Sequence, residues 1–129
     1  MGNDRRNRRL VVGDTTWRWS VRHRHHDGPD GSCAEVLSLR RDGTSAVLRL
    51  VFRAGNGRFV ADGWWYSGSV TNGRDLLNLH EPGVVRRFVD MAAADGLFPP
   101  DAVRGLEVDA WPLYDRLVAD GAQDADSPP

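Results

Sequence analysis

The sequence predicts an α+β fold, in which an antiparallel β-meander of five or six strands precedes two C-terminal helices packed on one face of the sheet. Three observations predict this class. Apolar and polar residues alternate over much of the first 80 positions, which is the period of β-strands. Turn signals containing glycine separate these runs at short intervals. After about residue 82 the apolar residues recur at spacings of three and four, as in amphipathic helices.

The first strand is expected over residues 16–25. Trp17 and Trp19 alternate there with Arg18, and the alternation continues to His23 and His25. Successive side chains of a strand point to opposite faces. We therefore expect the tryptophans and these two histidines on the helix-covered face, and the arginines on the other.

The remaining strands are bounded by turn residues. Leu37 and Leu39 share one face of the second strand, and residues 46–53 alternate to form the third. Asp62-Gly63 is either a further hairpin or a bulge in one long strand. The expected turns are Asp42-Gly43, Gly55-Asn56-Gly57 and Asn72-Gly73.

Two helices are expected after residue 80. Pro82 suits the first turn of a helix, so His80 and Glu81 are interpreted as the junction between a strand and this helix. Gly96 is placed to end it, and Asp109 to cap the second helix. The predicted buried stripes are Val85, Phe88, Val89 and Ala92 in the first helix, and Trp111, Tyr114, Leu117 and Val118 in the second.

Length and composition predict one soluble domain. A chain of 129 residues is long enough for a single core, and we expect a flexible basic arm at 1–9, the folded domain at 10–120 and a disordered acidic tail at 121–129. No run reaches the roughly 18 apolar residues of a membrane span, and the N-terminal apolar stretch is too short for a signal peptide. A lone Cys33 agrees with a reducing compartment. Cytoplasmic residence is therefore expected.

Charge is unevenly distributed along the chain. Residues 1–26 contain seven arginines and two acids (7 − 2 = +5), whereas residues 95–129 contain two arginines and eight acids (2 − 8 = −6). This distribution could let copies associate head to tail, with a homodimer as one expectation, or it could steer a partner to one end. It disfavours a strong general attraction to nucleic acid. All 17 basic residues are arginine, which indicates a GC-rich genome rather than selection for guanidinium chemistry.

A candidate metal site lies at residues 23–33. His23, His25, His26 and Cys33 could supply the nitrogen and sulfur ligands of a tetrahedral zinc ion, the one cofactor that the sequence suggests. Their spacing matches no standard zinc module. The alternative is a polar strand end with partly exposed histidines.

A candidate partner surface is formed by Trp64, Trp65 and Tyr66. Adjacent residues of a strand point to opposite faces, so one of the two tryptophans is expected outside the helix-covered core. An exposed tryptophan is a suitable anchor for a protein partner or a second copy. Burial of both by loops or by the N-terminal arm is the alternative.

Other functions have less support. Arg18, Arg22 and Arg24 could hold phosphates of a nucleic acid, but they lie on the face opposite Trp17 and Trp19, and the chain as a whole is slightly acidic. No nucleophile elbow, phosphate-binding glycine loop or carboxylate pair is evident. No catalytic residue is therefore assigned, and enzymatic activity is not favoured.

A resemblance to known proteins is also visible. Trp-Arg-Trp-Ser-Val at 17–21, Phe-Arg-Ala-Gly at 52–55 and Asn-Leu-His-Glu-Pro-Gly-Val-Val-Arg at 78–86 resemble small uncharacterised proteins of high-GC actinobacteria. The resemblance implies a bacterial source and a shared fold, and it implies nothing about mechanism. The function expected first is a non-enzymatic protein-interaction module, with zinc binding and nucleic-acid binding as alternatives.

Overall fold

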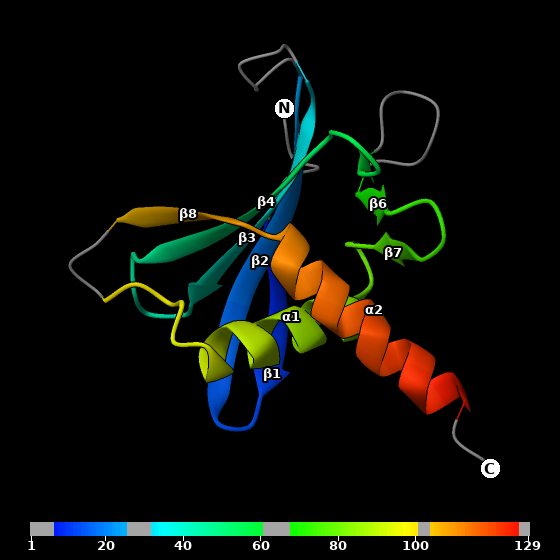
Figure 1. Ribbon diagram of the computed structural model, residues 1–129. Helices are drawn as coiled ribbons and strands as arrows, with labels where there is room; N and C mark the ends of the chain where they lie inside the picture. The colour runs from blue at the N-terminus through cyan, green and yellow to red at the C-terminus, as the bar shows by residue number, and fades with distance from the viewer. Residues whose placement is uncertain (1–6, 26–31, 61–67, 101–103, 127–129) are drawn as a thin grey trace.

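The computed structural model describes residues 7–25, 32–60, 68–100 and 104–126, and the side chains up to residue 120. Its strands are β1 (Arg8–Val12), β2 (Thr15–Arg24), β3 (Ala34–Arg41), β4 (Val47–Arg53), β5 (Phe59–Val60), β6 (Ser69–Thr71), β7 (Leu76–Asn78) and β8 (Gly105–Asp109), and its helices are α1 (Pro82–Ala94) and α2 (Trp111–Asp126). Figure 1 shows both helices on one side of a twisted sheet, so the fold is α+β as the sequence predicts.

The strands form two sheets, whereas the sequence predicted a single meander. A five-stranded sheet has the order β1-β2-β3-β4-β8, and a three-stranded sheet has the order β5-β6-β7. Only β1 to β4 form consecutive antiparallel pairs within the larger sheet, and β8 joins β4 in parallel. The prediction missed β8 because this edge strand is short and largely exposed, and its alternation includes only two apolar residues, Leu106 and Val108.

The described elements extend past the predicted domain limits. Strand β1 begins at Arg8, within the expected arm, because residues 8–12 pair with residues 15–19 of β2. Helix α2 continues to Asp126, past the expected boundary at residue 120. The segment containing Asp62-Gly63 lies outside the described residues.

The alternation of β2 decides which face of the sheet is covered. Trp17 and Trp19 are buried, as predicted, and share one core with residues of both helices. The four buried residues of α1 are those of the predicted stripe, and Gly96 follows the helix with the left-handed φ of 68° expected of its cap. Neither described helix combines the length and the apolar character of a membrane span.

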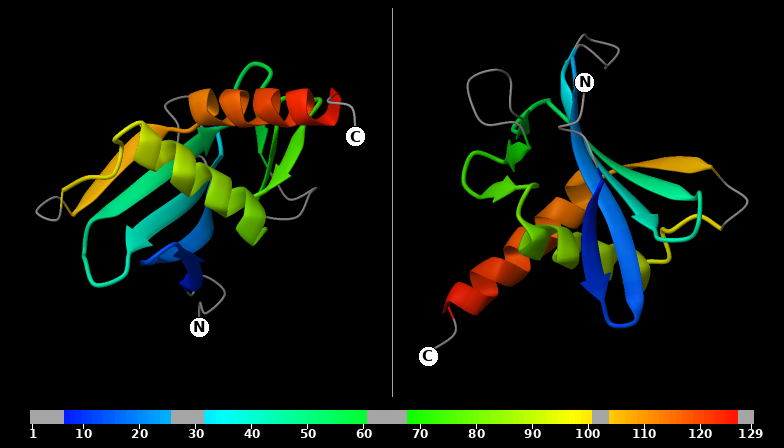
Figure 2. Two further views of the ribbon diagram at one scale, coloured as in Figure 1. Left: turned by 90° about the horizontal axis from the view of Figure 1, so that it is seen from below. Right: turned by 180° about the vertical axis from the view of Figure 1, so that it is seen from behind.

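Helix packing is less simple than two helices on one sheet face. Helix α2 contacts both sheets, which Figure 2 shows from two further directions. The Trp111 indole N–H donates to the carbonyl of Arg53 in β4, at 2.9 Å. The Tyr114 hydroxyl accepts from the backbone N–H of Asn72, at 2.9 Å, and donates to the carbonyl of Asp75, both in the β6–β7 turn.

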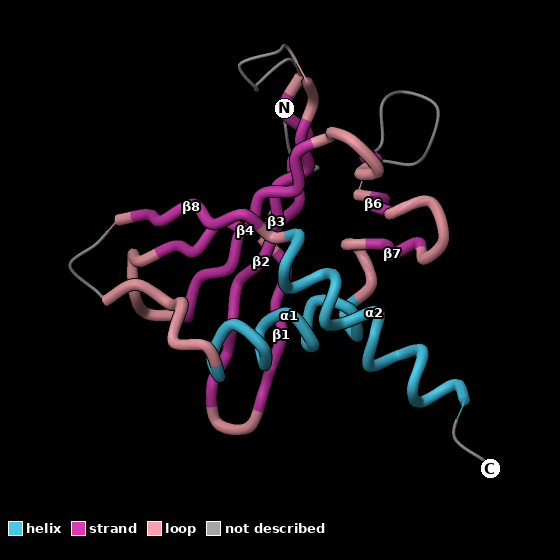
Figure 3. The backbone as a smooth tube through the Cα atoms, viewed as in Figure 1, coloured by secondary structure: helices cyan, strands magenta, loops and turns pink. Residues whose placement is uncertain are grey.

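The three-stranded sheet therefore shares the inner layer with the helices (Figure 3). Val60, Val70 and Leu79, from this sheet and its flank, belong to the same core as Leu37 and Leu50 of the large sheet. The sequence did not show this division because periodicity reports which side of a strand is buried and not which strand it pairs with.

Replacing Phe88 by Ala tests the shared core. Phe88 is fully buried and stacks edge-on against Phe52 of β4, with 5.7 Å between ring centroids. We expect Phe88→Ala to lower the free energy of unfolding by about 3 to 5 kcal/mol, measured by urea denaturation. Phe59 is 45% exposed, so Phe59→Ala should cost about 1 kcal/mol or less. Equal losses in the two variants would contradict this description of the core.

Candidate metal centre

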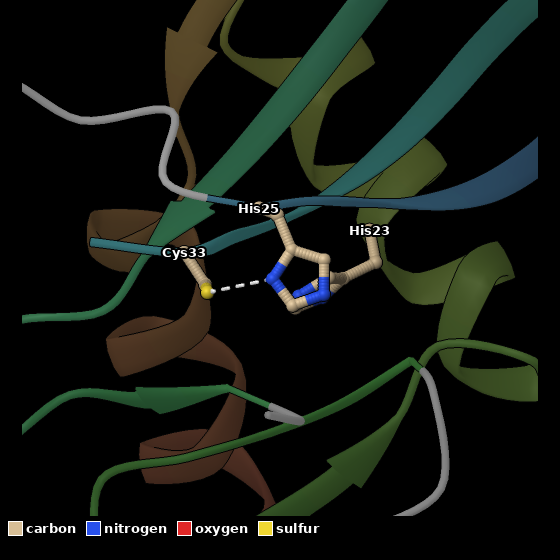
Figure 4. Close-up of side chains that lie close together, drawn as sticks. All are labelled: His23, His25 and Cys33. Carbon is tan, nitrogen blue, oxygen red and sulfur yellow. Dashed lines mark hydrogen bonds between the residues drawn. The ribbon is translucent and has the colours of Figure 1, made fainter. Parts of the chain in front are cut away.

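Three of the four predicted metal ligands meet at one end of the large sheet. His23 and His25 point the same way from the end of β2, as their spacing predicts, and Cys33 directly precedes β3 (Figure 4). One ligand atom from each lies within 4.8 Å of the others. His26 lies outside the described residues.

The separations suit a small soft metal ion. Cys33 Sγ and His25 Nδ1 are 3.6 Å apart. Zinc–sulfur bonds of about 2.3 Å and zinc–nitrogen bonds of about 2.0 Å at a tetrahedral angle put such atoms roughly 3.5 Å apart. The imidazole rings of His23 and His25 lie edge to face with centroids 4.6 Å apart. The cluster is therefore close to the size that a tetrahedral ion requires.

A buried carboxylate orients the first of these histidines. Glu35 stands directly opposite His23 in the β2–β3 register, and its side chain has no solvent exposure. One carboxylate oxygen pairs with Nδ1 of His23, and the other accepts the backbone N–H of Gly68 at 3.0 Å. Both oxygens of Glu35 thus have partners, one from each sheet.

Burial and hydrogen bonding shift the pKa of Glu35 in opposite directions. Removal from water raises the pKa of the Glu35 carboxyl above its ordinary value. The hydrogen bond and charge of His23, and the N–H of Gly68, lower the pKa and offset part of that rise. The carboxylate is therefore held in the core by its two partners.

Glycine is required at residue 68, whose backbone N–H is the second partner of Glu35. Gly68 has a φ of +91°, and a Cβ there would lie 2.6 Å from Cδ2 of His80. The bare backbone lets the start of the small sheet come close enough to reach Glu35. His80 and Glu81 form the predicted junction, since Glu81 is the N-cap residue of α1 and Pro82 opens the helix.

The second nitrogen of His23 is the atom that most directly indicates a ligand. Its Nε2 is buried, and within the described part of the chain no hydrogen-bond partner meets it. An unpaired buried polar atom costs free energy unless a ligand meets it. Histidines that bind a metal through one ring nitrogen characteristically donate the N–H of the other to a group such as a carboxylate. His23 has both features.

Sequence reasoning missed Glu35. The signal was a charged residue inside the apolar run Ala34 to Leu39, since glutamate is almost never fully buried without a partner. His23 is its cross-strand neighbour, but that register could not be read before the strands were paired.

The other predicted site residues lie elsewhere. Arg18, Arg22 and Arg24 line a groove on the opposite face of the sheet, away from the histidines. The partner surface of Trp64, Trp65 and Tyr66 falls outside the described residues, so the interaction module stays a prediction.

The pKa of Glu35 predicts a distinctive pH dependence. Because its pKa is raised in the fold, the stability contributed by Glu35 is fullest below its ordinary value of 4.5 and declines as pH rises through the folded value. We expect the difference in unfolding free energy, wild type minus Glu35→Gln, to fall as pH rises above about 4.5. Urea denaturation with a chelator present measures it. A difference that stays constant with pH would contradict the raised pKa of Glu35. The same pH dependence in Glu81→Gln would contradict its assignment to Glu35.

Comparison of the chain with protein-family models, with curated proteins and with solved structures gave no match. The function is therefore inferred from the arrangement of this chain's own side chains, above all His23, His25, Cys33 and Glu35.

Proposed function

We propose that the protein binds a divalent metal ion of the zinc class through His23, His25 and Cys33. The observation that supports this most directly is the buried, unpartnered Nε2 of His23, whose Nδ1 is held by Glu35. A bound ion would supply the partner that this nitrogen lacks, and it would account for a histidine–carboxylate pair in the core.

The ligand types favour zinc over the common hard cations. Two imidazoles and a thiolate are nitrogen and sulfur donors, which zinc accepts, whereas magnesium and calcium require oxygen ligands. Glu35 acts behind His23, as the carboxylate that fixes the ring, and not as a ligand.

The position of the cluster gives the ion a place at the edge of the core. Cys33 is 8% exposed and His23 is half-buried, whereas His25 is open to solvent. Three side chains leave one position of a tetrahedral ion, to be filled by water, a small ligand or a further side chain. Such an ion would link the end of β2 to the residue that precedes β3, and it could polarise a ligand at the fourth position.

Zinc titration against a chelating dye tests the proposal. Wild type should bind one ion per chain, and Cys33→Ser and His25→Ala should abolish this binding because each removes a ligand. Glu35→Gln should weaken it by about 10- to 100-fold, the usual effect of losing the carboxylate behind a metal-binding histidine. Asp90→Asn is the control, since Asp90 is an exposed residue of α1 outside the cluster, and should bind as wild type does.

Cobalt(II) supplies a second readout, which reports directly on a bond between the metal and the thiolate of Cys33. A cobalt–thiolate bond gives a near-ultraviolet charge-transfer band, which we expect in wild type and Asp90→Asn and not in Cys33→Ser. Failure of wild-type protein to bind zinc or cobalt at micromolar concentration would refute the proposal, as would equal binding by the ligand variants.

A further inference from the structure

A second candidate site lies on the face of the large sheet away from the helices. The residues of β2 that alternate with Trp17 and Trp19 point to this face, where they meet residues of β3 and β4 around a groove of about 290 Å³. The described residues of its lining include no acidic side chain and five arginines, Arg18, Arg22, Arg24, Arg40 and Arg49.

The register of the sheet brings like charges into direct opposition. Arg9 stands opposite Arg18, and Arg18 stands opposite Arg40, so three arginines form one row across β1, β2 and β3. Like charges at directly opposed positions destabilise a sheet. Arrangements that cost stability in the free protein are expected at functional sites, and a row of arginines is suited to binding an anion.

Neighbouring acids neutralise only part of this charge. Arg18 makes a 3.4 Å ion pair with exposed Asp42 at the rim, and such pairs contribute little. Arg24 is held by Glu107 of β8, with its shortest contact at 2.6 Å. Among the described residues, Arg22 and Arg49 have no carboxylate partner.

The floor of the groove strengthens the attraction for an anion. Val36, which lines the groove, belongs with Ala34 and Val51 to a small buried apolar cluster on this face, separate from the main core. Apolar surroundings lower the local dielectric and increase the field of nearby charges. Ser20 and Ser38, which face each other across β2 and β3, add hydroxyl donors to the lining.

We propose that this groove binds a small molecule bearing two or three linked phosphate groups. Guanidinium groups donate paired hydrogen bonds that match phosphate oxygens. The volume is close to the lower end of small-molecule sites, about 300 Å³. No described residue of the lining has an aromatic side chain on which bases could stack, so a phosphate cluster fits this groove better than a single-stranded nucleic acid does.

Calorimetric titration with sodium tripolyphosphate tests this proposal. The protein must be metal-free, because tripolyphosphate itself chelates divalent ions, and this condition also separates the result from that of the zinc proposal. Wild type should bind, with an affinity that falls as salt is added. Arg22→Gln and Arg49→Gln should each weaken binding by about tenfold or more, since each removes charge-assisted hydrogen bonds.

A matched variant and a second ligand make the test decisive. Arg86→Gln removes an exposed arginine of α1, far from the groove, and should leave the affinity unchanged. Circular dichroism should show all three variants folded, because none of the substituted residues belongs to the core. Absence of binding by wild type, or equal weakening by Arg86→Gln, would overturn the proposal. Tighter binding of a single-stranded oligonucleotide through the same arginines would overturn the assignment to a small phosphate compound.

Discussion

A fully buried carboxylate sets the strongest constraint on this fold. Burying Glu35 is unfavourable unless its oxygens are hydrogen-bonded, and its two partners come from different sheets, His23 of β2 and the N–H of Gly68 before β6. The small sheet must therefore lie against one end of the large one, and residue 68 must be glycine to come that close to His80. The same carboxylate fixes the ring that presents Nε2 to the cluster.

Strand β2 separates two kinds of chemistry by its alternation. Its inward residues proceed from Trp19 in the core to His23 at the edge of the core, where the candidate metal ligands lie close together. Its outward residues include Arg18 and Arg22, which line the basic groove. A cation and an anion could therefore occupy the same strand without competing, because the sheet lies between them.

The sequence predicted local features well because they depend on residues close together in the chain. The alternation over 16–25, the stripe of α1 and the cap at Gly96 follow from period and turn chemistry, and the structure confirms them. Strand β8 and the division into two sheets depend on pairing between distant segments, which periodicity does not encode.

The candidate site was predictable to the same extent. His23, His25 and Cys33 could be grouped from their spacing and residue types, because the period of two puts both histidines on one face. Glu35 could not be added, since its role follows from the β2–β3 register and from the approach of Gly68. The arginine row likewise became visible only once β1, β2 and β3 were aligned.

The protonation pattern of the His23 ring tests the central claim most directly. If Glu35 orients this ring, the proton of the neutral imidazole is on Nδ1 and Nε2 is the bare nitrogen. Long-range nitrogen–proton correlation NMR of metal-free protein, assigned with a His23→Gln variant, distinguishes the two tautomers. We expect the Nδ1–H form, with the Nε2 resonance shifting when zinc is added. An Nε2–H form in the metal-free protein, or an Nε2 resonance that zinc leaves unchanged, would contradict the account.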